Sequence, residues 1–221
     1  MKALFFSLLT LGALVSPSLS ITAAANGPAA REFSAMTTAT AHPTPTFLPM
    51  DSHREVRRTS VLIDGNPAEL TRHERSDGRN AGLFGEHISV LHAPDGRLKG
   101  FARLSLDLAG EPLPDREETE NIARAFLADH APDLLPTMKI SWIEPHDETI
   151  VDRTGGAETT VTVTGMKVKA RNLADGTWFW VIVGGDRTPM VFERDIVWIA
   201  FPGHRQTEKW LHDNWLNERS G

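Results

Sequence analysis

The sequence predicts an α+β fold in which a curved antiparallel sheet packs on one main helix, with an N-terminal hairpin and a short C-terminal helix. Three observations favour this fold class. Apolar and polar residues alternate in several short segments that are separated by Gly, Pro and Asp. Apolar residues recur at helical spacing in residues 117–127. The run Trp178–Val183 is apolar at every position, which is typical of a central strand covered on both faces.

The N-terminal residues have the pattern of a secretory signal peptide. Lys2 precedes an apolar run over residues 3–15, and the small residues Ala23 and Ala25 precede a cleavage point. Cleavage after Ser20 satisfies the same rule, and we favour the site after Ala25, which makes residues 1–25 the signal. The run is shorter than the roughly 20 apolar residues that cross a bilayer. We therefore expect a periplasmic or secreted protein without a membrane span after cleavage.

The rest of the chain divides into a linker and one domain. Residues 26–52 are rich in Ala, Thr and Pro with almost no periodic apolar residues, which predicts a disordered linker. Residues 53–221 are long enough to bury one core. The chain has no Cys, which excludes disulfides and thiolate sites. Its net charge of −6 argues against a nucleic-acid partner, which requires clustered Lys and Arg.

Two hairpins are predicted first along the domain. Strand-like residues from His53 reach the turn at residues 64–67, and residues 75–85 hold three glycines and are interpreted as a loop. Ile88 and Val90 then alternate up to the turn at Pro94, Asp95 and Gly96. Beyond that turn apolar residues recur at every second position, from 98 to 108, as in a half-buried strand.

The main helix is predicted to begin after Asp115. Asp115 and Glu118 have the spacing of a capping box, and further carboxylates in the first turns favour a helix N-terminus. Ile122 and Phe126 are the largest residues of the apolar stripe, so we expect them to anchor the helix to the sheet. The helix should end near His130, before the next proline.

Four more strands are predicted over residues 138–143, 159–171, 177–183 and 189–199. A change of apolar parity at Gly165 predicts a β-bulge there. The polar residues His146, Asp147 and Glu148 are assigned to a turn. The second face of the central strand needs a cover, for which the N-terminal hairpins and residues 206–216 are the candidates.

Residues 86–198 resemble the PepSY-like modules of exported bacterial proteins, a group related to the propeptides of thermolysin-type peptidases. The resemblance lies in the Asp95–Gly96 turn with residues 99–101, the helix over residues 117–127, and the hairpin that ends at residues 191–194. It implies a cystatin-like arrangement of one helix on a curved sheet. It also implies binding in the envelope or inhibition of a peptidase, without catalytic residues.

Known catalytic and metal-binding motifs are missing from the sequence. The spacings of His87 with His92 and of His204 with His212 are unsuited to one metal ion, and the cluster of residues 146–148 is expected in a solvent-facing turn. We therefore predict no metal, and we also predict no cofactor. Paired carboxylates at Asp107 and Glu111, or at residues 147 and 148, are the glycosidase alternative.

The tryptophans are the remaining candidates for a site. Trp178 and Trp180 lie on one face of the same predicted strand, and Trp198 lies on the next. Buried, they fill the core; exposed, they suit a binding surface. We predict a non-catalytic binding or peptidase-inhibitory module with a polypeptide partner, and name these three residues as its site. The alternative is a small periplasmic hydrolase or a carbohydrate-binding protein.

Overall fold

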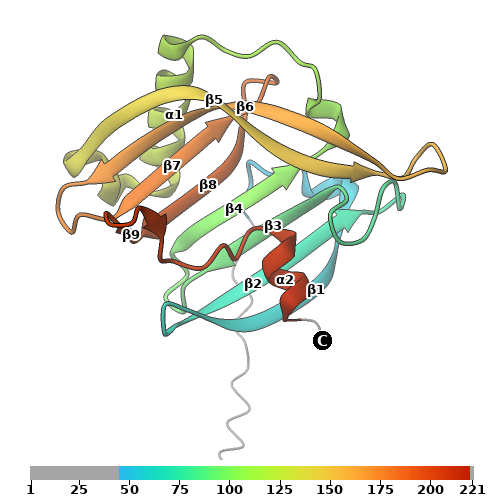
Figure 1. Cartoon of the computed structure of the whole chain (residues 1–221), viewed down its shortest axis with the longest axis horizontal. Helices are drawn as coiled ribbons and strands as arrows, with labels where there is room; N and C mark the ends of the chain where they lie inside the picture. Colours follow the sequence, from blue (N-terminus) through green and yellow to red (C-terminus); the bar gives the residue numbers. More distant parts are fainter. Residues whose placement is uncertain (1–44, 220–221) are drawn as a thin grey trace, which may run out of the picture. The chain divides into compact units, whose positions relative to one another are not determined.

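Residues 45–219 are described by the computed structural model, and they form mainly one antiparallel sheet (Figure 1). The sheet has eight strands in the order β1-β2-β3-β4-β8-β7-β6-β5, and a separate hairpin pairs β9 with β10. The strands are β1 (His53–Ile63), β2 (Asn66–Arg75), β3 (His87–His92), β4 (Leu98–Leu104), β5 (Met138–Asp152), β6 (Thr159–Asn172), β7 (Trp178–Val183), β8 (Pro189–Ile196), β9 (Trp198–Ile199) and β10 (His204–Arg205). The helices are α1 (Arg116–His130) and α2 (Asp213–Glu218), with short 3-10 turns η1 (Met50–Ser52), η2 (Leu106–Leu108) and η3 (Pro132–Thr137).

The predicted fold class is wrong. The described chain is mostly a large antiparallel sheet with few helices, and not a sheet packed on one main helix. The physical reason is size: α1 has 15 residues, about 22 Å of helix, and its main sheet contacts are with β5, β6, β7 and β8. One helix of that length cannot cover eight strands. The rest of the apolar surface is covered by other parts of the chain.

One face of the sheet packs against α1. The predicted start of this helix is confirmed, since the Asp115 side chain accepts a hydrogen bond from the Glu118 amide at 2.8 Å. Phe126 is buried and packs against Phe101 and Phe192, and Ile122 is half-buried beside the same cluster. The stripe predicted from the sequence is therefore the face that the helix buries.

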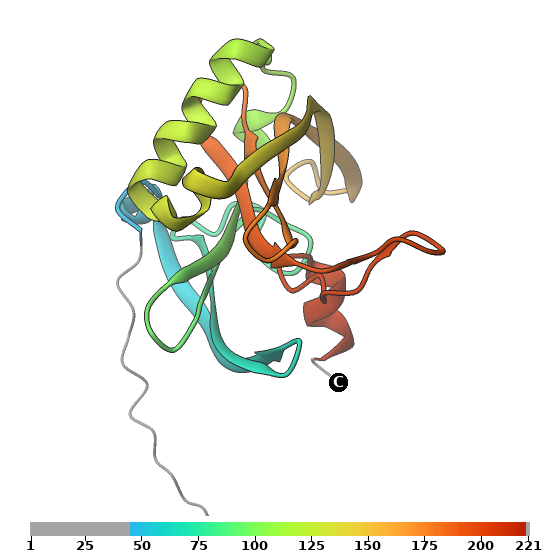
Figure 2. The same cartoon turned by 90° about the vertical axis from the view of Figure 1, so that its left-hand side faces the viewer.

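The opposite face is covered by the C-terminal segment. Trp210, Leu211 and Trp215 are buried in a second apolar cluster with residues of the sheet. Of the two covers proposed for this face, residues 206–216 and the N-terminal hairpins, the first is the one that these residues provide. Figure 2 shows α1 and α2 on opposite sides of the sheet. Gly100 makes the close approach of Trp210 possible, because a Cβ at that position would collide with the Trp210 ring and with the Phe192 carbonyl.

The strands agree with the sequence in most places and differ in four. The strand predicted over residues 98–108 ends at Leu104, and the strand predicted over residues 189–199 is divided into β8 and β9. The first two hairpins and the central strand β7 are confirmed. No bulge occurs at Gly165, where pairing with β5 is continuous. The parity changes because Val163 faces the C-terminal cluster, whereas Met166 faces the α1 cluster. The predicted turn at His146 is also wrong, because β5 continues through it to residue 152.

The far end of the β5–β6 hairpin meets the loop between β2 and β3. The Val151 amide donates a hydrogen bond to the Phe84 carbonyl at 2.7 Å, and the Arg153 amide donates one to Asn80 Oδ1 at 3.1 Å. These bonds join the last strand of the sheet to a loop next to its second strand. The sheet therefore bends around the C-terminal segment.

Residues 45–52 belong to the folded part. Leu48 is buried, and the ring of Phe47 contacts those of Phe101 and Phe126. The folded region thus begins before His53. The predicted signal peptide and most of the predicted linker lie outside the described residues. Within residues 45–219, no helix combines the length and apolar character needed to cross a membrane.

Candidate binding site

A pocket of about 580 Å³ lies on the face of the sheet that the C-terminal segment covers. Its floor comes from β4, β5, β6, β7 and β8, and its walls come from the loop before β3 and from residues 203–214. The polar groups among its lining residues are His87, His146, Glu148, Lys167, Glu193, His204, Arg205, Lys209, His212 and Asp213. Charged groups from separate parts of the chain therefore meet around one space.

Lys167 is placed on the pocket floor by β6. Its Nζ lies 4.2 Å from the centre of the Trp180 ring, a cation–π contact, and the residue is only 9% exposed. Burial lowers the pKa of Lys167 to about 8, although the carboxylates of Glu193 and Glu148 act in the opposite direction. The side chain is therefore an amine that is much easier to deprotonate than a surface lysine.

Glu193 and Glu148, the two pocket carboxylates that act on Lys167, have other cationic partners. Glu193 accepts hydrogen bonds from both terminal nitrogens of Arg205, at 2.7 and 3.4 Å. Glu148 lies 3.4 Å from His146 Nε2 and 4.0 Å from His212 Nδ1. Burial raises the pKa of Glu148, but these histidines together with Lys167 outweigh burial and leave the pKa below its usual value. Glu193 is therefore paired with Arg205, and Glu148 with His146 and His212.

Asp213 fixes the C-terminal wall to the sheet. Arg72 on β2 donates two hydrogen bonds to its carboxylate, at 2.6 and 3.0 Å, and the Phe84 amide donates a third. His87 Nδ1 lies 2.9 Å from the Gly85 carbonyl, so this nitrogen carries the proton, and Nε2 has no hydrogen-bond partner among the described residues. Burial, together with the charge of Arg72, lowers the pKa of His87 to about 4.

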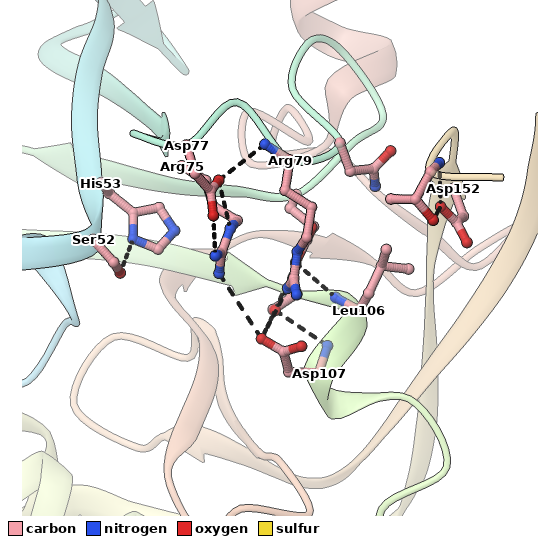
Figure 3. A network of polar contacts seen from close by, with 12 residues as sticks. Ser52, His53, Arg75, Asp77, Arg79, Leu106, Asp107 and Asp152 are labelled. Atoms are coloured by element: carbon pink, nitrogen blue, oxygen red, sulfur yellow. Dashed lines mark hydrogen bonds and ion pairs between the residues drawn. The ribbon is translucent and has the colours of Figure 1, made fainter. Parts of the chain in front are cut away.

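An ion network fixes the loop that carries Phe84 (Figure 3). Arg79 donates to Asp107 at 2.8 Å and to buried Glu86 at 2.6 Å, while Arg75 pairs with Asp77. The Glu86 carboxylate also accepts the Leu106 amide at 3.1 Å. These contacts attach the loop to η2, and the hydrogen bond from the Phe84 amide attaches it to Asp213. This wall of the pocket is therefore fixed on both sides.

Beside the pocket lies a second feature, which we call the tryptophan–cation strip: Trp142, Lys169, Arg171, Trp178 and Trp198. Lys169 Nζ lies 4.7, 4.8 and 5.5 Å from the ring centres of Trp178, Trp198 and Trp142. The Arg171 guanidinium lies 5.8 Å from the Trp178 ring centre. Arg171 is exposed and Trp198 is 43% exposed, so the strip is open to solvent.

The three tryptophans named from the sequence are divided between these two features. Trp178 and Trp198 belong to the strip, where Trp178 is half-buried, and Trp198 also reaches the pocket. Trp180 is 6% exposed and supports the pocket floor beneath Lys167. Trp180 is therefore buried, whereas Trp178 and Trp198 are accessible, so the three rings do not form one exposed stripe.

The other candidates are also redistributed. His204 and His212 both line the pocket, and His87 does so without His92. His146 and Glu148 face the pocket from β5, while Asp147 accepts a hydrogen bond from Thr164. Asp107 serves the loop network, whereas Glu111 lies against Gly185. In the part of the chain that the structure describes, no group of three or more His, Asp or Glu is arranged to hold a metal ion.

Lys167, Arg205 and Glu193 were not recognised from the sequence. A signal for the first was present, because Lys167, Lys169 and Arg171 alternate with apolar residues along one strand. That pattern indicates a strand with one basic face. Comparison of the chain with family models, curated proteins and solved structures finds no match. The resemblance to PepSY-like modules stays a prediction.

Proposed function

We propose that the protein is a non-catalytic binding module of the bacterial envelope, acting as a partner or inhibitor of another protein, and that it binds an acidic polypeptide on the tryptophan–cation strip. The observation that carries the proposal is the enclosure of Lys169 by three tryptophan rings within 5.5 Å, with Arg171 beside them. The export pattern of the N-terminal residues supports the compartment.

Charge and topology support a polypeptide as the ligand. Lys169 and Arg171 have no carboxylate within 4 Å in the described chain, so a partner's Asp or Glu would complement them. β5 is the edge strand next to β6, and no strand pairs with its outer side within residues 45–219. An extended segment could add to this edge and place acidic side chains on the strip.

The test is affinity capture from a bacterial envelope extract, followed by mass spectrometry and titration of the purified captured protein. We expect Trp198→Ala and Lys169→Met each to weaken binding by about 2 kcal/mol, roughly thirtyfold in Kd. Leu62→Ala is the matched control, because Leu62 is 63% exposed on β1 and belongs to neither feature. Equal capture by all variants would refute the proposal, as would capture that a glycosidase abolishes and a protease does not.

A small hydrolase is the second candidate, and the pocket favours it. His146 with Glu148 and the buried amine of Lys167 are titratable groups that converge on one cavity. Turnover of an ester, glycoside or peptide by the purified protein, lost in His146→Gln, would support a hydrolase and contradict the non-catalytic proposal. Binding at the strip without turnover would support the first proposal.

A further inference from the structure

We propose that Lys167 forms a reversible imine with a small carbonyl compound, a 2-oxo acid or an aldehyde, that enters the pocket. Imine formation there does not depend on binding at the tryptophan–cation strip. The pocket would hold its ligand covalently without turning it over. Three properties of the amine support this: where it lies, which groups surround it, and how readily it loses its proton.

The amine of Lys167 faces the pocket without a partner of opposite charge. The side chain lines the cavity, and its Nζ rests on the Trp180 ring at 4.2 Å. Among the described residues it has no ion pair within 4 Å. A lysine that is 9% exposed and contacts an aromatic ring instead of a carboxylate is poorly solvated. Desolvation of this kind is one of the ways in which a lysine becomes a nucleophile.

The groups around the amine leave it available. Glu193 on β8 is bound to Arg205 on β10, and Glu148 on β5 is shared by His146 and His212. Lys169 on the same strand and Arg205 add positive charge, which disfavours the ammonium form. Glu193 and Glu148 act in the opposite direction and favour the ammonium form, but neither pairs directly with Nζ. Lys209 in the pocket wall supplies a positive charge for the carboxylate of a 2-oxo acid.

The lowered pKa of Lys167 favours the reaction at neutral pH. With a pKa of about 8, roughly a fifth of Lys167 is the neutral amine at pH 7.4, against roughly a thousandth for a lysine with the ordinary value. The ratio is about two hundredfold. Limited access to the pocket offsets part of this advantage, so we expect a net preference of at least about tenfold over an exposed lysine.

The proposed step balances in atoms and electrons. The nitrogen lone pair of Lys167 attacks the carbonyl carbon and gives a carbinolamine. One amine proton moves to the former carbonyl oxygen to give the carbinolamine hydroxyl. The C–O bond then breaks, the second amine proton is lost from nitrogen, and the hydroxyl leaves as water. One amine and one carbonyl thus yield one imine and one water. His146, which lies beside Glu148 in the same pocket, is one group there that can carry a proton to the departing hydroxyl. No oxidant or reductant takes part.

The experiment traps the imine on the folded chain. The protein is incubated at pH 7.4 with pyruvate, or in a separate arm with propanal, in the presence of sodium cyanoborohydride, and modification is mapped by mass spectrometry. Lys139, exposed on β5, and Lys99, paired with Asp195 at 2.8 Å, are internal controls. We expect Lys167 to be modified at least about tenfold faster than Lys139, and the rate to level off near pH 8.

Two further arms test whether the folded pocket causes the preference for Lys167. Unfolding the chain in guanidinium should remove the preference, and Leu62→Ala, an exposed β1 residue that belongs to neither the pocket nor the strip, should leave it intact. Faster trapping with pyruvate identifies a 2-oxo acid site, and faster trapping with propanal identifies an aldehyde site. Modification of Lys167 no faster than that of Lys139 with both probes overturns the proposal, whatever happens at the strip.

Discussion

Replacement of Phe126 by alanine tests the packing of α1 on the sheet. The Phe126 ring lies 5.2 Å from the ring centres of Phe47 and Phe192 and 5.6 Å from that of Phe101. Truncation of a buried Phe costs about 3 to 5 kcal/mol. Each aromatic pair adds about 0.5 to 1.5 kcal/mol to the burial of area, so three pairs place this residue near the upper end, at about 4 to 5 kcal/mol. That is a large share of a typical stability of about 5 to 15 kcal/mol.

Urea unfolding followed by far-UV circular dichroism measures this loss. The control is Arg124→Ala, because Arg124 is exposed on the same helix and, among residues 45–219, makes only an ion pair with Glu120 at 2.7 Å. Its removal should change stability by less than about 0.5 kcal/mol. A loss below about 1 kcal/mol for Phe126→Ala would mean that the ring is not buried between helix and sheet, and the reasoning about this face would be refuted.

Two further perturbations test the other face. Gly100→Ala should lower stability by about 1 to 3 kcal/mol and change the near-UV signal of Trp210, because the added methyl meets that ring and a backbone carbonyl; unchanged stability would show that Trp210 does not lie on β4. The lowered pKa of His87 means that the unfolded chain binds its proton first, so stability should fall as pH drops from about 6.5 towards 4. His87→Gln should show a shallower fall over this range in urea melts, and identical slopes would contradict the assignment.

Local signals account for the part of the fold that the sequence predicted. The turn at Asp95 and Gly96, and Asp115 as a helix N-cap, act within a few residues, and the structure contains both. The second half of β5 was missed because Pro145 and the polar residues after it are typical of turns. β5 lies at the edge of the sheet, where a proline removes no hydrogen bond from an interior strand. Edge position is a property of the assembled sheet.

The pocket was beyond sequence reasoning for a similar reason. Lys167, Glu193 and Arg205 come from three different strands, and the ion pair between Arg72 and Asp213 joins residues 141 positions apart. Spacing along the chain says nothing about such encounters. More of the strip could be predicted, since basic residues occupy every second position in β6 and tryptophans occupy alternate positions in β7. Only their registration across strands required the structure.

The C-terminal cover has a consequence for how the chain is made. Trp210 and Trp215 follow all eight strands along the chain, so the strands are synthesised before the residues that shield their second face. Until they are in place, the apolar residues of the second face are exposed to water and to neighbouring chains, and the chain is prone to aggregate. A stop codon in place of the Trp210 codon would make that transient state permanent. The residues from Trp210 to Leu216 are therefore needed to complete the second face of the sheet.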